Sequence, residues 1–365
     1  MSEWQTFCLK DLGKIVGGAT PSTNNLKNYG NKIAWITPKD LSTLQGRYIK
    51  KGSRSISRLG FKSCSCVLLP KHAILFSSRA PIGYVAIAKK RLCTNQGFKS
   101  IIPNKKIYFE FLYYLLKYHK DNISNIGGGT TFKEVSGATL GLFEVKIPPT
   151  YYEQQKIART LSVLDQKIEN NHKINELLHT LAYKIYEYYF KYKPKNAKLE
   201  QIIIENPKSS IMVKNAQKTQ DKYPFFTSGD NTLSYPKAII DGRNCFLNTG
   251  GNAGIKFYVG KASYSTDTWC ICANEFSDYL YLLLSSIKNH INQSFFQGTS
   301  LKHLQKNLLK KYPIYMPSAH EIKKFNQMIM PLLTLISINT RTSKKLEQIR
   351  DFLLPLLLKQ QVKPE

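Results

Sequence analysis

The sequence predicts an α+β protein: two tandem mixed α/β domains separated by long antiparallel helices that form a coiled-coil spacer, arranged as an internal pseudo-twofold repeat. Three observations predict this architecture. A short Gly-Thr motif occurs twice, a long pattern of apolar residues with heptad spacing follows each copy, and a turn-rich segment of strand patterns precedes each copy. The chain therefore alternates globular segment, helix, globular segment, helix.

The first globular segment spans residues 1–150. Short apolar runs bounded by Gly, Pro and Ser predict strands at 33–36, 67–69, 73–76 and 84–88. The run of aromatic residues and leucines at 108–119 predicts a helix. The second globular segment, from about residue 197 to residue 312, shows the same order of patterns, so we expect it to share this fold.

The repeated motif reads Gly129-Thr130-Thr131-Phe132-Lys133 in the first copy and Gly298-Thr299-Ser300-Leu301-Lys302 in the second. About fifteen residues later, each copy reaches a proline-containing segment and then a long helical pattern. The repeat therefore includes a globular segment together with the helix that follows it.

The two helical patterns carry apolar residues at alternating spacings of four and three, which is the signature of a helix that packs along one face. Asn residues interrupt both patterns at the same place, and a buried Asn costs stability but penalises slipped registers. Two unrelated amphipathic helices remain the alternative. We expect the helix-pair interface to contain Ile157, Leu161, Leu164, Ile168, Asn171 and Leu178 in the first helix and Phe325, Ile329, Leu332, Ile336, Asn339 and Leu346 in the second.

These patterns divide the chain into four parts: a first domain at 1–150, a spacer helix at 151–195, a second domain at 196–317 and a C-terminal helix at 318–365 that pairs with the spacer. The first helix is expected from about residue 153 to 189, a length of roughly 55 Å. Pro331 and Pro355 lie in the second helix and are each expected to kink or end it.

The charge balance indicates a polyanionic partner. The chain has 53 Lys and Arg against 24 Asp and Glu, a net charge of +29, and cations placed on phosphates release counterions and strengthen binding. Lysine enrichment from AT-rich coding is an alternative source of part of this charge. No apolar run is long enough to span a membrane, and the N-terminus lacks a signal-peptide pattern, so a cytoplasmic protein is expected.

The sequence lacks the motifs of the enzyme classes that act on nucleic acids. The segment Gly250–Lys256 has the composition of a phosphate-binding loop but not its spacing, and Asn206-Pro207 is not followed by the residues of an amino-methyltransferase. The seven cysteines include two C-x-C pairs and no C-x-x-C pair, and no zinc site is expected. We therefore predict no catalytic residue and no metal ligand.

The candidate DNA-binding residues are polar side chains near the Gly-rich turns and the repeated motif. Arginine commonly contacts guanine through two hydrogen bonds, and asparagine pairs with adenine. Solvated surface arginines, turn-forming asparagines and helix caps are the competing explanations. The candidates are Lys39, Arg54, Arg58, Ser77 and Arg79 in the first segment, Asn248, Thr249, Asn252 and Lys256 in the second, and Thr130, Lys133, Thr299 and Lys302 in the repeated motif.

The opening segments 17–23 and 33–41 resemble the start of a target-recognition domain of a type I restriction-modification specificity subunit. The segment 148–168 resembles the conserved spacer helix of that family, and 350–355 resembles its C-terminal end. The second copy departs from the spacer pattern, because Ile322-Lys323 and Leu333 stand where the first has Gln154-Gln155 and Asp165.

This resemblance implies a non-catalytic subunit whose two recognition domains each read one half of a bipartite, gapped target in double-stranded DNA. It implies two modification subunits, which methylate adenine, and restriction subunits, which translocate and cleave DNA. S-adenosylmethionine, ATP and Mg would then belong to those partners, and no cofactor to this chain. A catalytic nuclease or methyltransferase with a DNA-recognition module, and a general nucleic-acid-binding scaffold, are the alternative functions.

Overall fold

A computed structural model describes residues 3–129, 133–216 and 222–364. The chain divides into two compact units: unit 1 is formed by 1–170 together with 343–365, and unit 2 by 171–342. Both unit boundaries fall inside long helices, α6 (Tyr151–Tyr186) and α11 (Ala319–Leu358). Each unit therefore contains one globular segment and part of each long helix, whereas the division made from the sequence separates the helices from the globular segments.

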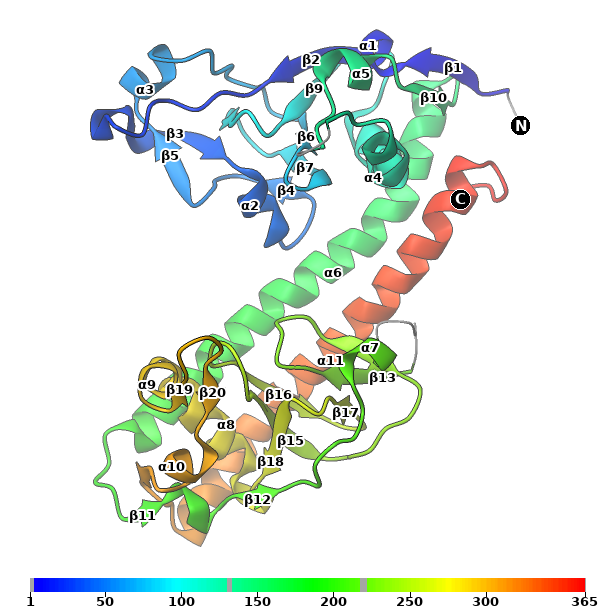
Figure 1. Cartoon of the computed structure of the whole chain (residues 1–365). Helices are drawn as coiled ribbons and strands as arrows, with labels where there is room; N and C mark the ends of the chain where they lie inside the picture. Colours follow the sequence, from blue (N-terminus) through cyan, green and yellow to red (C-terminus); the bar gives the residue numbers. More distant parts are fainter. Residues whose placement is uncertain (1–2, 130–132, 217–221, 365) are drawn as a thin grey trace. The chain divides into compact units, whose positions relative to one another are not determined.

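Unit 1 contains a five-stranded sheet in the order β2-β9-β6-β7-β4, a three-stranded sheet in the order β5-β3-β8, and the pair β1-β10 (Figure 1). Helix α4 (Phe109–Asn125) packs on strands β6 and β7 and buries Phe111, Leu112 and Leu115. The strands are β1 (Gln5–Cys8), β2 (Gly13–Gly17), β3 (Tyr29–Ile36), β4 (Tyr48–Ile49), β5 (Arg54–Ile56), β6 (Ile74–Ser78), β7 (Ile82–Ala88), β8 (Cys93–Thr94), β9 (Lys99–Pro103) and β10 (Glu144–Ile147). The short helices are α1 (Leu9–Leu12), η1 (Leu26–Asn28), α2 (Pro38–Ser42), α3 (Arg58–Lys62) and α5 (Gly137–Gly141).

Three of the four expected strands and the expected helix of unit 1 are present, as β3, β6, β7 and α4. The strand expected at 67–69 is wrong. Only Leu69 pairs there, in an isolated bridge with Leu92. Pro70 follows directly and has no N–H to continue a ladder, and His72 then turns the chain with a φ of 70°.

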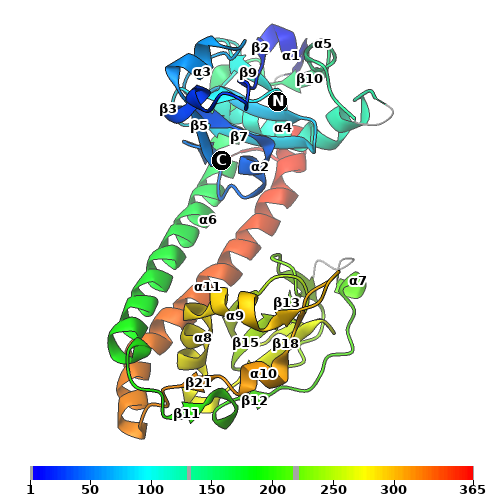
Figure 2. The same ribbon diagram turned by 60° about the vertical axis from the view of Figure 1, so that its left-hand side comes forward.

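Unit 2 contains a four-stranded sheet in the order β12-β18-β15-β16, a three-stranded sheet in the order β14-β13-β17, and the pairs β19-β20 and β11-β21. Helix α8 (Ser277–Ser286) packs on β15 and β16 (Figure 2). The strands are β11 (Ala197–Lys198), β12 (Ile204–Glu205), β13 (Tyr223–Phe226), β14 (Leu233–Tyr235), β15 (Arg243–Asn248), β16 (Ile255–Val259), β17 (Ser263–Tyr264), β18 (Thr268–Cys272), β19 (Phe296–Gln297), β20 (His303–Leu304) and β21 (Pro313–Ile314). The remaining helices are η2 (Glu187–Lys191), η3 (Leu199–Gln201), α7 (Val213–Ala216), η4 (Asn274–Phe276), α9 (Lys288–Ser294) and α10 (Lys306–Lys310).

The repeat inferred from the sequence is visible in the strand order. The order β2-β9-β6-β7 of unit 1 corresponds to β12-β18-β15-β16 of unit 2. In both three-stranded sheets the central strand pairs antiparallel to one neighbour and parallel to the other, as β3 does with β5 and β8 and β13 does with β14 and β17. The two globular segments therefore share one fold.

The long helices run antiparallel within each unit. In unit 2, Asn175 of α6 bonds Asn339 of α11, and Tyr189 lies against Phe325. The interface predicted from the heptads agrees with the burial, because all twelve of its residues are buried or half-buried. Asn339 donates to Asn175, a residue outside the twelve predicted for the interface.

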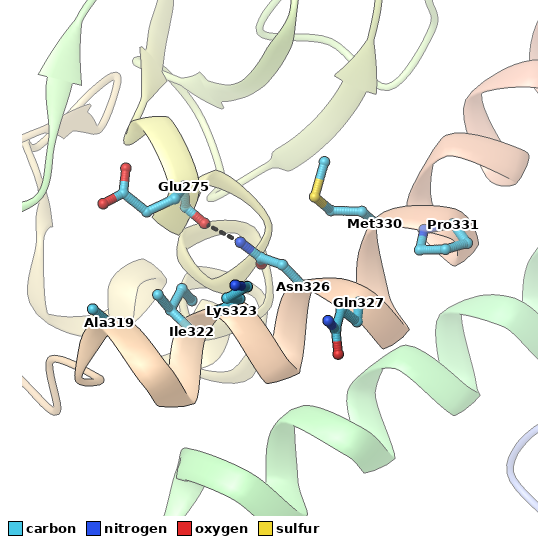
Figure 3. A pocket seen from close by; sticks show the side chains of 8 residues that line it. All are labelled: Glu275, Ala319, Ile322, Lys323, Asn326, Gln327, Met330 and Pro331. Carbon is cyan, nitrogen blue, oxygen red and sulfur yellow. Dashed lines mark hydrogen bonds between the residues drawn. The ribbon is translucent and has the colours of Figure 1, made fainter.

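Both long helices begin with the same capping arrangement. The Thr150 and Ser318 hydroxyls accept from the amides of Glu153 and Glu321, which lie three residues later. Of the two outcomes expected at the prolines, an end of the second helix is excluded, because α11 continues through both Pro331 and Pro355; Figure 3 shows Pro331 within the helix. Among the described residues, no helix is long and apolar enough to cross a membrane.

Candidate nucleic-acid interface

The repeated motif lies at a junction of three segments, which we call the repeat junction. In unit 1 it joins the turn after β6, the residues just before β9, and a hairpin closed by the bridge between Gly128 and Glu134. The Ser78 amide donates to the Gly97 carbonyl at 2.8 Å, and the Val135 amide donates to the Ser78 carbonyl at 3.0 Å. Main-chain hydrogen bonds thus fix all three segments together.

Unit 2 contains the same junction. Thr249 occupies the place of Ser78, because its amide donates to the Asp267 carbonyl at 3.3 Å and its carbonyl accepts from the Leu304 amide at 3.0 Å. The hairpin is again closed by a bridge, here between Gln297 and His303. The motif residues Lys133, Thr299 and Lys302 are exposed at this junction, whereas Thr130 lies outside the described residues.

Two predicted DNA contacts at this junction are buried and serve the turns instead. Ser77 is fully buried, and its hydroxyl donates to the Pro81 carbonyl and accepts from the Tyr84 amide, each at 2.8 Å. Asn248 is also buried and donates from Nδ2 to the Asn252 carbonyl at 3.1 Å. Their hydrogen bonds close the Gly-rich turns, so we exclude both side chains from the proposed DNA contacts.

Two further candidates in unit 2 are bonded within the protein. The Lys256 ammonium donates to the Thr227 carbonyl at 2.7 Å and to the Gly229 carbonyl, and burial lowers its pKa. The Thr249 hydroxyl donates to the Asp267 carbonyl at 2.6 Å. Lys256 and Thr249 therefore hold the junction in shape. Asn252 is exposed, and with Thr299 and Lys302 it is free to face a ligand at this junction.

At the junction of unit 1, the predicted contact Arg79 is partly exposed and pairs with Glu134. The same carboxylate contacts Lys99, which is the first residue of β9 and was not among the residues predicted from the sequence. The structure therefore joins two cations, one from the turn after β6 and one from the start of β9, around one carboxylate. Sequence spacing does not reveal this grouping.

The remaining candidates of unit 1 lie on α2, β5 and α3, away from the junction in the sequence. Lys39, Arg54 and Arg58 are all exposed. The Arg54 guanidinium stacks over the Tyr29 ring at 4.3 Å, which fixes the direction of its side chain. The structure also connects α2 to the residue before β5, since the Ser53 amide donates to Asp40 at 2.7 Å.

Residues 39–62, which we call the basic segment, hold more cations than sequence analysis selected. Exposed Lys50, Lys51 and Lys62 accompany the three predicted cations, and Asp40 is the one acidic residue in the segment. Burial raises the pKa of Asp40, but hydrogen bonds from Ser53 and Thr37 outweigh it and hold the pKa below its ordinary value. Counting charges over this stretch would have found the missing lysines.

In the part of the chain that the structure describes, no group of three or more His, Cys, Asp and Glu side chains lies close enough to hold a metal ion. A cavity of about 540 Å³ lies along α11 (Figure 3). Asn326 crosses it to donate to the Glu275 carbonyl at 2.7 Å, which ties α11 to η4.

The sequence matches the family described as type I restriction modification DNA specificity domain over residues 1–180 and 195–348. A relative, the specificity subunit of the type I restriction enzyme MjaIX from Methanocaldococcus jannaschii, is 33% identical over 98% of this chain and 93% of its own. The HindI specificity subunit of Haemophilus influenzae is 32% identical over 46% of this chain and 37% of its own.

A crystal structure of the S subunit of a type I restriction-modification system from M. genitalium has a similar fold. It aligns with a TM-score of 0.65 at 17% identity, over 97% of this chain and 96% of that one. The overall fold described above is therefore shared with a solved structure.

Proposed function

This chain belongs to the type I restriction-modification DNA specificity family, and we propose that it is the DNA-recognition subunit of such a complex. Each unit reads one half of a bipartite target in double-stranded DNA and leaves a gap unread between the halves. The observation that carries this proposal is the repeat junction, since the same three-segment arrangement presents different exposed side chains in the two units. One fold with two sets of contacts suits two different half-sites.

The distribution of charge supports duplex DNA as the ligand. The basic segment of unit 1 offers exposed cations for phosphates, and Arg54 and Arg58 lie among them. Phosphate contacts fix the register of a protein on DNA but carry no base information. We assign the basic segment to phosphates and the exposed residues of the repeat junctions to base edges: Arg79, Lys133, Asn252, Thr299 and Lys302.

Chemistry on DNA belongs to partner subunits in this proposal, and the chain itself is not an enzyme. Two modification subunits methylate adenine with S-adenosylmethionine, and restriction subunits translocate and cleave DNA with ATP and Mg. The complex acts in the cytoplasm, where DNA is accessible to it.

Exposed apolar side chains on the long helices of unit 2 support a docking role for the helix pair. Leu177 is 70% exposed and Leu181 50% exposed on α6, and Leu335 and Ile338 are also exposed on α11. Apolar residues that repeat along a helix face at heptad spacing suit a protein partner. We assign this face to a modification subunit. Helix α6 begins in unit 1 and ends in unit 2, so we propose that its length sets the number of unread base pairs between the two half-sites.

The test is a methylation map of DNA from cells that express this chain with its modification subunit, compared with cells that lack only this chain. A methyladenine motif in two half-sites with a fixed gap, present only when the chain is expressed, is the expected result. A continuous motif without a gap would contradict the proposal that the two units read separate half-sites. No motif from an assembled complex would contradict the assignment to DNA recognition.

A further inference from the structure

We propose that Glu134 is a specificity-determining residue of unit 1. Its carboxylate positions the Arg79 guanidinium for a base contact and prevents Arg79 and Lys99 from binding phosphates without regard to sequence. The inference rests on the proposed function, because it gives the repeat junction of unit 1 a detailed role in reading one half-site.

Glu134 lies between two cations from different segments, Arg79 in the turn after β6 and Lys99 at the start of β9. Its Oε2 atom is 3.3 Å from NH1 of Arg79, and its Oε1 atom is 3.3 Å from Nζ of Lys99. The three side chains are 34%, 37% and 21% exposed in the order Glu134, Arg79, Lys99. They are therefore accessible to a ligand, yet each is partly enclosed by the protein.

The backbone holds this triad before any ligand arrives. Glu134 exchanges two main-chain hydrogen bonds with Gly128, at 2.9 and 3.1 Å. Val135, the next residue, bonds Ser78, which immediately precedes Arg79, and Ser78 in turn bonds Gly97 two residues before Lys99. Because all three charges stand on segments joined in this way, their separation is set by the fold rather than by the side chains alone.

Lys133, the residue before Glu134, is a further cation at this junction and is exposed. Without the carboxylate, Arg79, Lys99 and Lys133 would bind any phosphate, and phosphate binding is independent of sequence. With Glu134 in place, a phosphate must displace a carboxylate from Arg79 and Lys99, so indiscriminate binding is weakened.

Arg79 keeps donors for a base while it is paired. Arginine has five N–H groups in a planar fork, and a contact with guanine uses two of them. The ion pair uses NH1, so the carboxylate orients the plane of the guanidinium and leaves other N–H groups unused by it. An oriented arginine discriminates between bases better than one that also reaches neighbouring phosphates.

Unit 2 lacks this triad. The two junctions can be aligned through equivalent strand pairs, Ser77 with Phe98 in unit 1 and Asn248 with Thr268 in unit 2. In this alignment Gly250 occupies the position of Arg79, and Trp269 occupies the position of Lys99. The two hairpins put His303 at the place of Glu134. The effect of Glu134 is thus confined to one half-site, which makes it testable inside one protein.

The experiment uses the assembled complex of this chain with its modification subunit and compares the wild type with Glu134→Gln. Duplex binding is measured over a salt series with cognate and unrelated DNA, and methylation is mapped in cells. Removal of one negative charge is expected to steepen the salt dependence of unrelated-DNA binding by about one unit of log Kd per log salt. Discrimination is expected to fall roughly tenfold at one base pair of one half-site, the size of a lost arginine contact.

Two control variants separate this role from a general effect of charge. Glu187 of unit 2 also lies between two lysines, Lys184 and Lys191, so Glu187→Gln makes the same change elsewhere and should leave the motif unchanged. Arg79→Lys keeps the charge but loses the planar fork, and should relax the same half-site without steepening the salt dependence.

Wild-type motif and salt dependence in Glu134→Gln would overturn the inference while leaving the proposed function intact. So would relaxation of both half-sites, or the same relaxation in Glu187→Gln. If the wild-type complex itself yields no two-part motif, the proposed function fails and the role of Glu134 fails with it. A thermal melt of each variant confirms folding, which the partial exposure of the triad predicts will be retained.

Discussion

Buried Asp165 of α6 and half-buried Arg350 of α11 form an ion pair in unit 1, with 2.7 Å between Oδ1 and NH1. The repeat puts Leu333 and Ala182 in their places in unit 2, and both of these are buried in the apolar core. One polar pair of unit 1 thus corresponds to one apolar pair of unit 2. The departure of Leu333 from the spacer pattern reflects packing inside each unit, because Asp165 also accepts a 2.5 Å hydrogen bond from the Tyr114 hydroxyl.

We expect Asp165→Leu to destabilise unit 1 by about 3 kcal/mol, because Arg350 and the Tyr114 hydroxyl would lose their buried acceptor. Asp165→Leu combined with Arg350→Ala, which copies the pair of unit 2, should cost less than the sum of the two single changes. Urea unfolding of the four proteins gives the coupling energy. Additive losses would show that the two side chains act independently.

The capping carboxylate Glu321 predicts a pH dependence. Its hydrogen bond with Lys193, aided by the Ser318 amide, lowers its pKa from 4.5 to about 2. A lowered pKa contributes stability above pH 4.5, and this contribution is lost as the pH falls from 4.5 towards 2. Because Glu321 is partly exposed, Glu321→Gln should cost about 0.5–1 kcal/mol at pH 7.

The check for Glu321 is a set of unfolding curves between pH 7 and pH 2. The difference between the wild type and Glu321→Gln should shrink through this acid range and vanish at its lower end. The matched control is Glu153→Gln, which changes the equivalent capping residue of α6 in unit 1. A constant difference at all pH values would show that charge is not the source of the effect.

Substitutions in the basic segment should weaken DNA binding uniformly. Arg54→Ala is expected to reduce affinity for cognate and unrelated duplexes alike, and to lower the salt slope by about one. Fluorescence anisotropy across a salt series measures both quantities. A loss restricted to cognate DNA would make Arg54 a base contact instead.

Substitution of a buried turn residue is expected to lower the stability of its unit and to leave the preferred DNA bases unchanged. Asn248→Ala removes the hydrogen bond to the Asn252 carbonyl and is expected to cost about 1–3 kcal/mol in unit 2. The exposed Lys302→Ala should change stability by less than about 0.5 kcal/mol. Methylation maps of both variants distinguish the roles: only Lys302→Ala is expected to alter the preferred bases of a half-site.

A charge introduced on the exposed apolar face of α6 is expected to prevent binding of the modification subunit. Leu177→Lys places an ammonium at a position that is already solvent-exposed, so the melting temperature of the free chain is expected to stay the same. Co-purification with the modification subunit should be lost. Unchanged assembly would exclude this face from the docking surface.

Periodic features were predictable from the sequence. The heptads predicted twelve positions that are buried or half-buried, and the duplicated motif predicted the repeat, because both follow from spacing along one chain. The junction triad was not predictable, since Arg79, Lys99 and Glu134 meet only through sheet pairing and a hairpin. Ser77 and Asn248 were misassigned because a polar residue after a strand can bond its own turn or face a ligand, and burial alone decides between these.

The order in which the chain forms the two units affects folding during synthesis. Unit 2 is one continuous stretch, whereas unit 1 combines 1–170 with residues 343–365. Leu354, Leu357 and Leu358 fill the core of unit 1 beside Ile157 and Leu161. On a ribosome the second unit can therefore fold first, whereas residues 1–170 of the first unit have an incomplete core until the last turns of α11 are synthesised. A premature stop near residue 343 would damage the domain that was translated first and spare the one translated last.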